Sequence, residues 1–508
     1  MQIDVMTPEA IAAEIADGAT IAVTGSGGGM LEADTIYAAM EARFLATGHP
    51  RDLTLIHALG IGDRKTLGTN RFAHDGMVRR VIGGHWTWSK PMQALAKTNR
   101  IEAYSLPSGV ISLLLRESGA GRPGLITRTG LGTFVDPLHG GGRVNAAAVD
   151  DIVERVELGG ETYLRYLPLK VDVAIIKGTF ADTSGNISMM DEPADLDSFA
   201  VALAGHNCGG RVYVQVRDRV QTGSLRPREV SLPGILVDAI TLCPAQDQTY
   251  RGGYDPALAG RVRTTLVPEQ TDAAGGPKRV IALRAAMELS PGACVNFGFG
   301  ASAGVAEIIS ERDAFDQYWT TIEQGIHGGS MLTGDMFGMA VNPVAILPAS
   351  NQFDFYHGGG LDAAFLGIAE VDATGNVNVS HIGGEIVGPG GFIDITQNAK
   401  KVVFCGTFDA RGSKVDVANG SIRIERDGEI RKFVPSVAAI TFSGAEALAR
   451  GQEVFYVTER AVFRLGPDGV ELMEIAPGAD LDRDILARME FAPVVRNVKP
   501  MSEALFRA

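Results

Sequence analysis

VNFGFGASAGVAEII, residues 295–309, places β-forming residues, a glycine-rich turn and an amphipathic helical pattern in direct succession. The same order occurs near the start of the chain, where TIAVTGSGGG (20–29) precedes ADTIYAAMEARFLATG (33–48). Further β-rich runs, such as VDVAIIKG (171–178) and KKVVFCGTF (400–408), alternate with other helical patterns. Strands that alternate with helices predict βαβ units and parallel pairing. We therefore expect an α/β protein with mostly parallel sheets and flanking helices.

Three stretches of the first half recur in the second half in the same order. FADTSGNIS (180–188) matches EVDATGNVN (370–378), and RVYVQV matches KVVFCG at the same offset of 190 residues. The turn before the opening strand also repeats, with Gly18 against Gly292 at an offset of 274 residues. Ordered similarity of this kind indicates a duplication. The two offsets differ by 84, so we expect an insertion of about that size within residues 60–150.

The chain is too long for one hydrophobic core, because 508 residues exceed the size at which a single core stops growing. We expect two related open α/β domains, an N-terminal one at 1–266 and a C-terminal one at 279–508. VPEQTDAAGGPK (267–278) joins them, and its proline, glycine and polar residues are typical of a linker.

Charge and cysteine content exclude several classes of protein. A net charge of −14, without a lysine- or arginine-rich block, argues against nucleic-acid binding. The cysteines (Cys208, Cys243, Cys294 and Cys405) lie far apart, which supports neither a zinc site nor a disulfide framework. MQIDVMTPEAIAAEIADG (1–18) predicts a capped helix and lacks the basic and apolar regions of a signal peptide. No apolar run approaches the ~18 residues that span a bilayer. We expect a cytoplasmic protein that does not bind membranes.

TTIEQGIHGG (320–329) places one carboxylate, Glu323, between a β-branched run and a glycine-rich turn. Burial of an unpaired carboxylate costs free energy. Three glycines in the next six positions would let a ligand approach the backbone closely. The carboxyl end of a strand is also where open α/β sheets bind ligands. We therefore predict that Glu323 belongs to a functional site.

The first stretch also permits a dinucleotide-binding interpretation. Gly298-x-Gly300-x-x-Ala303 lies between a strand and a helix, and Glu323 ends the next strand, where an acid would hold a ribose hydroxyl. The repeated loop GSGGG lacks this spacing, and the open backbone after Glu323 favours a bulky second substrate instead. NAD(P) binding is therefore the weaker alternative. No G-K-[ST] follows a glycine run and no G-x-S-x-G elbow is present, which argues against P-loop and α/β-hydrolase chemistry.

The histidines give no metal site. His327 and His357 flank the glycine-rich turns, but no third ligand lies at a suitable spacing. We interpret both as loop residues that make local hydrogen bonds, and we expect no metal.

Several long motifs resemble the family I CoA-transferases. In the second half these are EQGIHGG, NQFDFYHGGGLDAAFLGIAEVDATGNVNVS, GPGGFIDITQNAKKVVFCGTF and YVTERAVFRL; in the first half they are FAHDGMVRRVIGGHW, GLGTFVDP and IKGTFADTSGNIS. The likeness covers about residues 10–500 and is greatest to the single-chain acetate, propionate and short-chain acyl-CoA:carboxylate enzymes, whose α and β halves are fused. It accounts for the duplication, because both halves of this family share one open α/β fold.

The resemblance implies that Glu323 is the catalytic nucleophile. In this family the matching glutamate attacks an acyl-CoA to form an acyl–glutamyl anhydride, and CoA then attacks the anhydride to leave a glutamyl-CoA thioester. A free carboxylic acid reverses these steps and leaves as the new acyl-CoA. Such covalent catalysis divides one difficult exchange into easier steps. CoA is then a substrate and covalent intermediate, with no permanently bound cofactor, and we expect acids of about two to six carbons as partners.

The resemblance also implies a CoA and oxyanion pocket formed by glycine-rich loops. We assign to it Gly388, Gly390, Gly391 and Phe392 of the G-x-G-G-F loop, together with Gly298, Gly300, Ser108 and Gly109. Many relatives have L-P-Q-G where this chain has LPSG, so the shorter Ser108 replaces a glutamine near the thioester carbonyl.

Two further expectations rest on the family. Acyl-CoA hydrolases share this architecture, so a thioesterase is the main alternative to a transferase. A site between two halves and abundant apolar surface indicate a homodimer or homotetramer.

Overall fold

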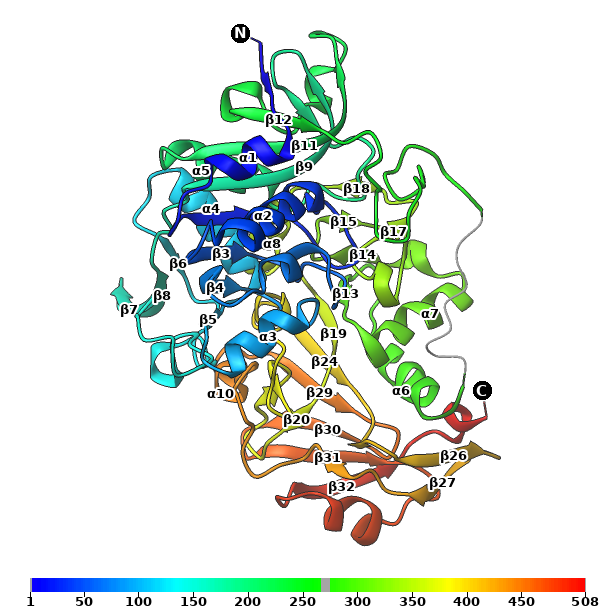
Figure 1. Ribbon diagram of the computed structural model, residues 1–508. Coiled ribbons are helices and arrows are strands. Elements are labelled where there is room, and N and C mark those ends of the chain that lie inside the picture. The colour runs from blue at the N-terminus through cyan, green and yellow to red at the C-terminus, as the bar shows by residue number, and fades with distance from the viewer. Residues whose placement is uncertain (1, 266–274, 508) are drawn as a thin grey trace.

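Each half of the chain forms one open α/β sheet in the computed structural model, which describes residues 2–265 and 275–507 (Figure 1). The N-terminal sheet has the order β1-β12-β11-β9-β2-β3-β4-β5, with β10 paired to β9. Its strands are β1 (Asp4–Val5), β2 (Thr20–Val23), β3 (Leu53–His57), β4 (Val78–Gly83), β5 (Glu102–Ser105), β9 (Val173–Asp182), β10 (Ile187–Ser188), β11 (Arg211–Val220) and β12 (Ala239–Leu242). Its helices are α1 (Pro8–Glu14), α2 (Asp34–Thr47), α3 (Lys90–Lys97), α4 (Ser108–Gly119) and α5 (Ser198–Asn207). Every pair except β9–β10 is parallel, as the alternating pattern predicts.

The C-terminal sheet has the order β18-β15-β14-β13-β19-β24-β29-β30-β31-β32 and is parallel from β14 to β29. Its strands are β13 (Cys294–Phe297), β14 (Trp319–Ile322), β15 (Ile326–His327), β18 (Ala345–Ile346), β19 (Ala363–Gly367), β24 (Lys401–Cys405), β29 (Glu453–Val457), β30 (Ala461–Gly466), β31 (Gly469–Ile475) and β32 (Val494–Pro500). Its helices are α6 (Gly276–Ala286), α7 (Ala303–Glu311), α8 (Ala349–His357), α9 (Phe392–Thr396) and α10 (Gly444–Ala449).

Both halves also contain smaller sheets of two or three strands. They are β6 (Leu125–Thr127) with β7 (Val153–Leu158) and β8 (Glu161–Tyr166), β16 (Ser330–Met331) with β17 (Ala340–Val341), β20 (Glu370–Val371) with β21 (Val377–Asn378), β22 (His381–Ile382) with β23 (Glu385–Ile386), β25 (Asp409–Ala410) with β28 (Ile430–Arg431), and β26 (Lys414–Ala418) with β27 (Ser421–Arg426). Among the described residues, no helix has both the length and the apolar character needed to cross a bilayer.

The predicted duplication is visible in strand order and in hydrogen bonds. The run β12-β11-β9-β2-β3 of the first sheet corresponds to β29-β24-β19-β13-β14 of the second. After β9, the Asn186 side chain donates to Asp182 at 2.9 Å, and after β20 the Asn376 side chain donates to Asp372 at 3.1 Å. The repeated D-x-x-G-N sequence therefore forms the same turn in both halves.

The structure bears on two expected boundaries, those of the insertion in the first half and of the linker between the halves. The inserted part of the first half extends past residue 150, because β7 and β8 complete the small sheet that begins with β6. Most of the predicted linker, 266–274, lies outside the described residues, and α6 already begins at Gly276.

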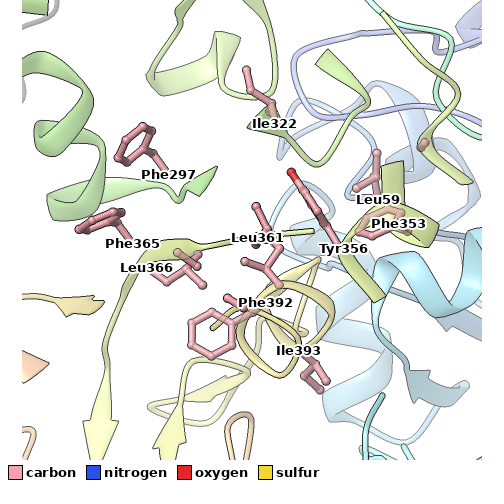
Figure 2. Packing of buried hydrophobic residues seen from close by; sticks show 14 of the residues in the cluster. Leu59, Phe297, Ile322, Phe353, Tyr356, Leu361, Phe365, Leu366, Phe392 and Ile393 are labelled. Carbon is pink, nitrogen blue, oxygen red and sulfur yellow. The ribbon is translucent and has the colours of Figure 1, made fainter. Parts of the chain in front are cut away.

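A shared core holds the ends of the central strands against α9. Phe297 of β13 stacks on Phe365 of β19 at 5.4 Å, and Phe392, the first residue of α9, stacks on Phe404 of β24 at 5.8 Å. Figure 2 shows Phe297, Phe365 and Phe392 in this layer, with Ile322 at the end of β14 nearby. The layer therefore fixes where the residue after Ile322 and the loop before Phe392 lie.

Candidate functional site

Glu323 is the first residue after β14. The strand pairs in parallel with β13 and in antiparallel with β15, and its last residue, Ile322, is buried. Glu323 itself is only partly buried. Its carboxylate therefore leaves the sheet at the carboxyl end of a strand, where ligands bind in open α/β folds.

The glycines after Glu323 accommodate the protein's own chain. A Cβ atom at Gly325, where φ is +98°, would lie 1.9 Å from the carbonyl oxygen of Leu347. At Gly329, where φ is +78°, it would lie 2.5 Å from that of Val341. The expectation that these glycines leave room for substrate is therefore wrong, because residues 341–347 fill the space.

The loop 388–392 connects the two halves beside Glu323. The N–H of Gly390 donates to the Gly84 carbonyl at 2.9 Å, and the Gly390 carbonyl accepts from the N–H of Ser108 at 2.8 Å. At the next residue, the backbone N–H of Gly391 lies near the Glu323 carboxylate and lowers its pKa. A Cβ atom at position 391 would lie 1.8 Å from Oε2 of Glu323. The loop thus gives the carboxylate a backbone donor at a position where a side chain would collide with it.

Two cavities meet at Glu323. The first, of about 410 Å³, is lined mainly by the C-terminal half. The second, of about 370 Å³, is lined by both halves. Both are bordered by Glu323, His85, Phe299, Phe337, Val387 and Gly390. The carboxylate therefore lies where two adjoining cavities meet, each large enough for part of a substrate.

The surroundings of Glu323 disfavour its charge. Burial, and next the negative charge of Asp394, raise the pKa of Glu323 to about 7, whereas the Gly391 N–H and the Gln324 amide act in the opposite direction. Asp394 is itself fully buried. Its Oδ1 lies 2.8 Å from Nε2 of His357, and its Oδ2 accepts the N–H of Gly109, near the start of α4, at 2.9 Å.

Two neutral polar side chains border these cavities: His85 lines both of them, and Gln324 lines the second. Burial lowers the pKa of His85 to about 4, so its imidazole is uncharged at neutral pH. The Gln324 amide nitrogen lies 3.5 Å from Oε1 of Glu323 and 3.4 Å from Oγ of Ser26. Oε1 of Gln324 is buried and has no hydrogen-bond partner among the described residues, so it remains available to a donor on a ligand.

The structure brings together most of the residues assigned to the site from sequence. Those that line the first cavity with Glu323 are Gly298, Gly388, Gly390, Gly391 and Phe392. Gly300, Ser108 and Gly109 do not line either of the two cavities at Glu323. The Ser108 hydroxyl donates to the Ala58 carbonyl at 2.6 Å. Gly109 contributes indirectly, through its bond to Asp394.

Five residues near Glu323 were not identified from sequence: Arg64, His85, Trp88, Gln324 and Asp394. His85 and Asp394 lie within two of the motifs that carry the family resemblance, GGHW and GGFID. Their place within these motifs could have identified both residues from the sequence. Which of these side chains face the glutamate depends on how the two halves pack, which the motifs do not specify.

The expectation of loop histidines with local hydrogen bonds is wrong, because His327 lies in β15, His357 ends α8, and both contact residues distant in the sequence. Nε2 of His327 lies 2.5 Å from the side-chain oxygen of Gln352, and His357 pairs with Asp394. The described residues contain no group of three His, Cys, Asp or Glu side chains placed to hold a metal ion.

Comparison with known proteins agrees with this geometry. Residues 5–242 match the family model described as "Coenzyme A transferase". The chain is 41% identical over 500 residues to "Acetate CoA-transferase YdiF" of Escherichia coli O157:H7, covering 97% of this chain and 93% of that one. The chain belongs to the coenzyme A transferase family.

Two other relatives support the same conclusion. "Caffeate CoA-transferase" of Acetobacterium woodii is 40% identical over 506 residues, covering 97% of this chain and 95% of that one. The crystal structure of the E. coli O157:H7 YdiF apoenzyme superposes with a TM-score of 0.94 at 40% identity, over 99% of this chain and 96% of that one. YdiF has also been solved as a thioester complex with CoA, with the same TM-score of 0.94. The protein is thus an enzyme, a CoA-transferase, and the dinucleotide interpretation is not retained.

Proposed function

We propose that this CoA-transferase moves CoA from a short-chain acyl-CoA to a free carboxylic acid through a glutamyl-CoA thioester on Glu323. The observation that carries the proposal is the placement of the Glu323 carboxylate, which borders two cavities and lies beside the backbone N–H of Gly391. A nucleophile that meets two substrates in turn needs such double access.

The reaction follows a balanced sequence of acyl transfers. An oxygen of Glu323 attacks the acyl-CoA carbonyl, the C–S bond breaks, and CoA thiolate leaves an acyl–glutamyl anhydride. The thiolate attacks the glutamyl carbonyl, and the first acid leaves as its carboxylate. The second acid attacks the glutamyl-CoA thioester, and the same steps run in reverse. Each tetrahedral intermediate carries an oxyanion. We assign the Gly391 N–H, which lies near the Glu323 carboxylate, to the oxyanion that forms when the thiolate or the acid attacks the glutamyl carbonyl.

The charge environment of Glu323 favours formation of the covalent intermediate. Burial and the Asp394 charge destabilise the free carboxylate. In the anhydride and in the thioester the glutamyl group is neutral, so this unfavourable interaction is relieved as the bond forms. The raised pKa also indicates a more basic, and hence more nucleophilic, carboxylate.

We assign the two cavities to the two substrate parts. The first is bordered by the backbone of the loop 388–392 and by Phe299, and it suits the pantetheine arm of CoA. The second is bordered by Trp88, Leu59 and Gly60, and it suits the acyl group. The names of the relatives, an acetate and a caffeate CoA-transferase, support carboxylic acids as the acceptor class. We further expect a cytoplasmic homodimer or homotetramer.

A single experiment tests the proposal. The protein is incubated with acetyl-CoA in the absence of an acceptor, and its intact mass and peptide map are measured. We expect one CoA adduct on Glu323 that borohydride or hydroxylamine removes, and its loss in Glu323→Gln. Addition of acetate should then regenerate acetyl-CoA. Absence of the adduct, or CoA transfer by Glu323→Gln, would overturn the role of Glu323. Release of free CoA at the same rate with and without acceptor would indicate a thioesterase instead.

A further inference from the structure

Arg64 supplies the positive charge of the second cavity. Of the described residues that line the two cavities beside Glu323, Arg64 is the one lysine or arginine. His85 is uncharged at neutral pH, because burial lowers its pKa to about 4. The arginine side chain is 45% exposed, so it lies where the cavity meets solvent. A cation at this place provides local attraction for an anionic substrate in a protein whose net charge is −14.

The backbone around Arg64 is held in an unusual conformation. Arg64 has φ = +71°, a region that L-residues other than asparagine and aspartate rarely adopt. Oδ1 of Asp63 accepts the N–H groups of Lys65 at 2.9 Å and Thr66 at 2.7 Å, and the N–H of Arg64 donates to the Trp88 carbonyl at 2.8 Å. Non-glycine residues in this region cluster at functional sites, where the surroundings impose the conformation. These backbone hydrogen bonds fix the conformation of the loop at Arg64, and hence the direction in which its side chain leaves the backbone.

The guanidinium rests on a rigid aromatic surface. The Cζ atom of Arg64 lies 4.2 Å from the centre of the Trp88 ring. A Cβ atom at Gly27 would lie 2.0 Å from that ring, and one at Gly60 would lie 2.5 Å from it. Glycine at both positions therefore leaves room for the indole ring. The indole in turn orients the guanidinium by a cation–π contact.

The present ionic partner of Arg64 is a weak one. A single contact of 3.4 Å joins its Nη1 to Oδ1 of Asp335, and the two side chains are 45% and 60% exposed. Exposed pairs with one long contact contribute little free energy. A substrate anion that offers both of its oxygens to the guanidinium fork would make a stronger contact.

We propose that Arg64 binds a second carboxylate at the far end of the acid substrate, so that this enzyme favours aliphatic dicarboxylic acids over monocarboxylic acids. The inference rests on the proposed function of Glu323. One carboxylate of the acid attacks the glutamyl-CoA thioester and displaces CoA thiolate. The other carboxylate stays at the solvent-exposed end of the cavity, where it keeps much of its hydration and contacts Arg64. The thiolate then attacks the acid carbonyl of the anhydride, which releases the mono-CoA thioester and restores the Glu323 carboxylate.

The charges around the second cavity favour binding of the acid at the stage when the glutamyl-CoA thioester is present. While the glutamyl-CoA thioester exists, Glu323 is neutral, so it no longer repels an incoming anion. Arg64 then remains as the charged side chain that lines the second cavity. An acid with two charges is therefore drawn to the mouth of the cavity when the thioester is ready to react.

The test compares acceptors that have the same carbon chain. The acceptor KM and kcat are measured for glutarate and for pentanoate, with acetyl-CoA as donor, in the parent enzyme and in Arg64→Gln, Asp335→Asn and Lys65→Gln. We expect a glutarate KM below that of pentanoate in the parent. Arg64→Gln should raise the glutarate KM about tenfold, the scale of one charge-assisted hydrogen bond. It should change the pentanoate KM much less than the glutarate KM, because pentanoate has no second carboxylate for Arg64 to bind.

The other variants make the test specific. Asp335→Asn should lower the glutarate KM, because it removes the competing carboxylate. Lys65→Gln removes a positive charge from the same exposed loop and should leave both acceptors unaffected. An unchanged glutarate KM in Arg64→Gln overturns the inference, and so does a rise in the acetyl-CoA KM with every acceptor, which would place a CoA phosphate at Arg64. Failure of the proposed function has a different signature, since neither a CoA adduct nor transfer to any acceptor would then be found.

Discussion

The space occupied by Oε2 of Glu323 is the space that a side chain at position 391 would need. A Cβ atom there would lie 1.8 Å from this oxygen, and no other contact of that Cβ is shorter than 3.0 Å. Gly391 has φ = −84° and ψ = 4°, values that alanine adopts without strain. Gly391→Ala should therefore displace the Glu323 carboxylate rather than the backbone. We expect the rate of CoA-adduct formation to fall on the order of 10²-fold, because the displaced carboxylate is no longer aligned with the acyl carbonyl.

A double-mutant cycle separates this effect from general damage to the loop. In the Glu323→Ala background the collision partner is gone, so Gly391→Ala should then leave the thermal midpoint unchanged. In the parent background the same substitution should lower the midpoint. Equal effects in both backgrounds would show that the loop, and not the glutamate, requires glycine.

The first half-reaction should depend on pH through Glu323. The attacking form is the carboxylate, and its pKa is raised to about 7 by burial and by Asp394. The rate of adduct formation from acetyl-CoA should therefore rise with pH, with a midpoint near 7. Asp394→Asn keeps the shape and removes the negative charge, so the midpoint should move to lower pH. Stopped-flow or quenched-flow mass spectrometry from pH 5 to 9 measures both.

A neighbouring carboxylate provides the control for Asp394. Asp354 lies on α8 and pairs with Arg116. Asp354→Asn should leave the midpoint of the parent enzyme unchanged. If Asp394→Asn also leaves it unchanged, Asp394 does not influence the nucleophile.

The raised pKa of Glu323 also predicts a pH-dependent cost in stability. Between the ordinary value of 4.5 and about 7 the folded state binds more protons at this carboxyl than the unfolded state does. Stability therefore falls as pH rises through this window, by up to about 3 kcal/mol. Glu323→Gln cannot ionise, so its thermal midpoint should exceed that of the parent at pH 8 and approach it at pH 5. A difference between the two proteins that does not vary with pH would contradict the raised pKa.

The fold was predictable because its signals are local. The run before Gly298 forms β13, and the residues after Gly300 form α7. The repeated turns at Asp182 and Asp372 close with the same side-chain hydrogen bonds, so a match in sequence was also a match in structure. The lengths of the inserted segments were less predictable, because the small sheet at β6 is closed by strands beyond residue 150.

The site was only partly predictable because it is assembled across the two halves. Glu323 stood out as a carboxylate after a strand, and the loop 388–392 stood out by its glycines. The sequence did not indicate that Gly391 faces Glu323, or that Asp394 lies close enough to raise its pKa. Gly325 illustrates the converse error, because its closest neighbour is the Leu347 carbonyl and not a substrate. Which surface a loop glycine faces is decided by tertiary packing.

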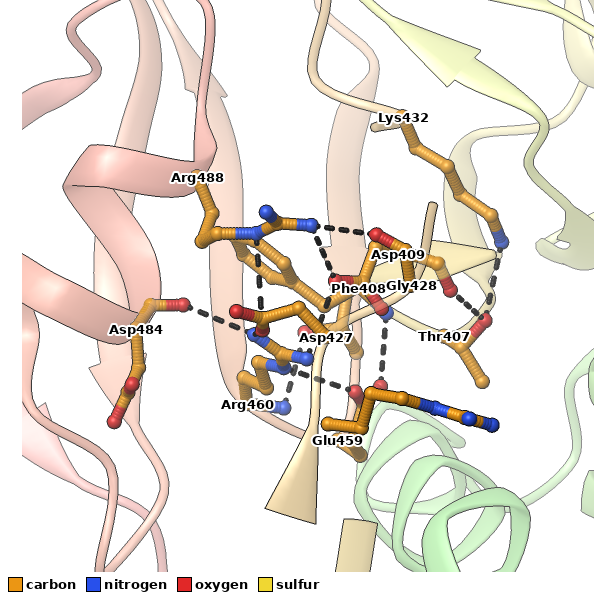
Figure 3. A network of polar contacts seen from close by, with 12 residues as sticks. Thr407, Phe408, Asp409, Asp427, Gly428, Lys432, Glu459, Arg460, Asp484 and Arg488 are labelled. Carbon is orange, nitrogen blue, oxygen red and sulfur yellow. Dashed lines mark hydrogen bonds and ion pairs between the residues drawn. The ribbon is translucent and has the colours of Figure 1, made fainter. Parts of the chain in front are cut away.

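The motif YVTERAVFRL helped to indicate the family, yet the first of its two arginines, Arg460, lies in a structural network and does not line the two cavities at Glu323. Arg460 is fully buried in the turn between β29 and β30. Figure 3 shows it among acidic side chains, with Nη1 2.8 Å from Asp427, Nη2 3.2 Å from Asp409 and Nε 3.3 Å from Glu459. Its guanidinium also lies 5.2 Å from the centre of the Phe408 ring. These contacts join β30 to the strand β25.

Arg460→Met should destabilise the fold without changing the chemistry. The substitution retains an unbranched side chain but leaves the buried Glu459 carboxylate without its ion-pair partner, whereas Asp409 keeps Arg488 at 3.1 Å. Breaking a buried pair in this way typically costs about 3–5 kcal/mol. The matched control is Arg464→Met in β30, the strand that follows Arg460, because Arg464 is 47% exposed and its contact with Glu471 is 3.5 Å long. Such a pair contributes about 0–1 kcal/mol. Calorimetry gives the thermal midpoints, and titration with acetyl-CoA counts the active sites that form the CoA adduct. We expect a lowered midpoint for Arg460→Met alone, with normal turnover per titrated site in both variants. An unchanged midpoint with lost adduct formation would instead assign this motif to catalysis.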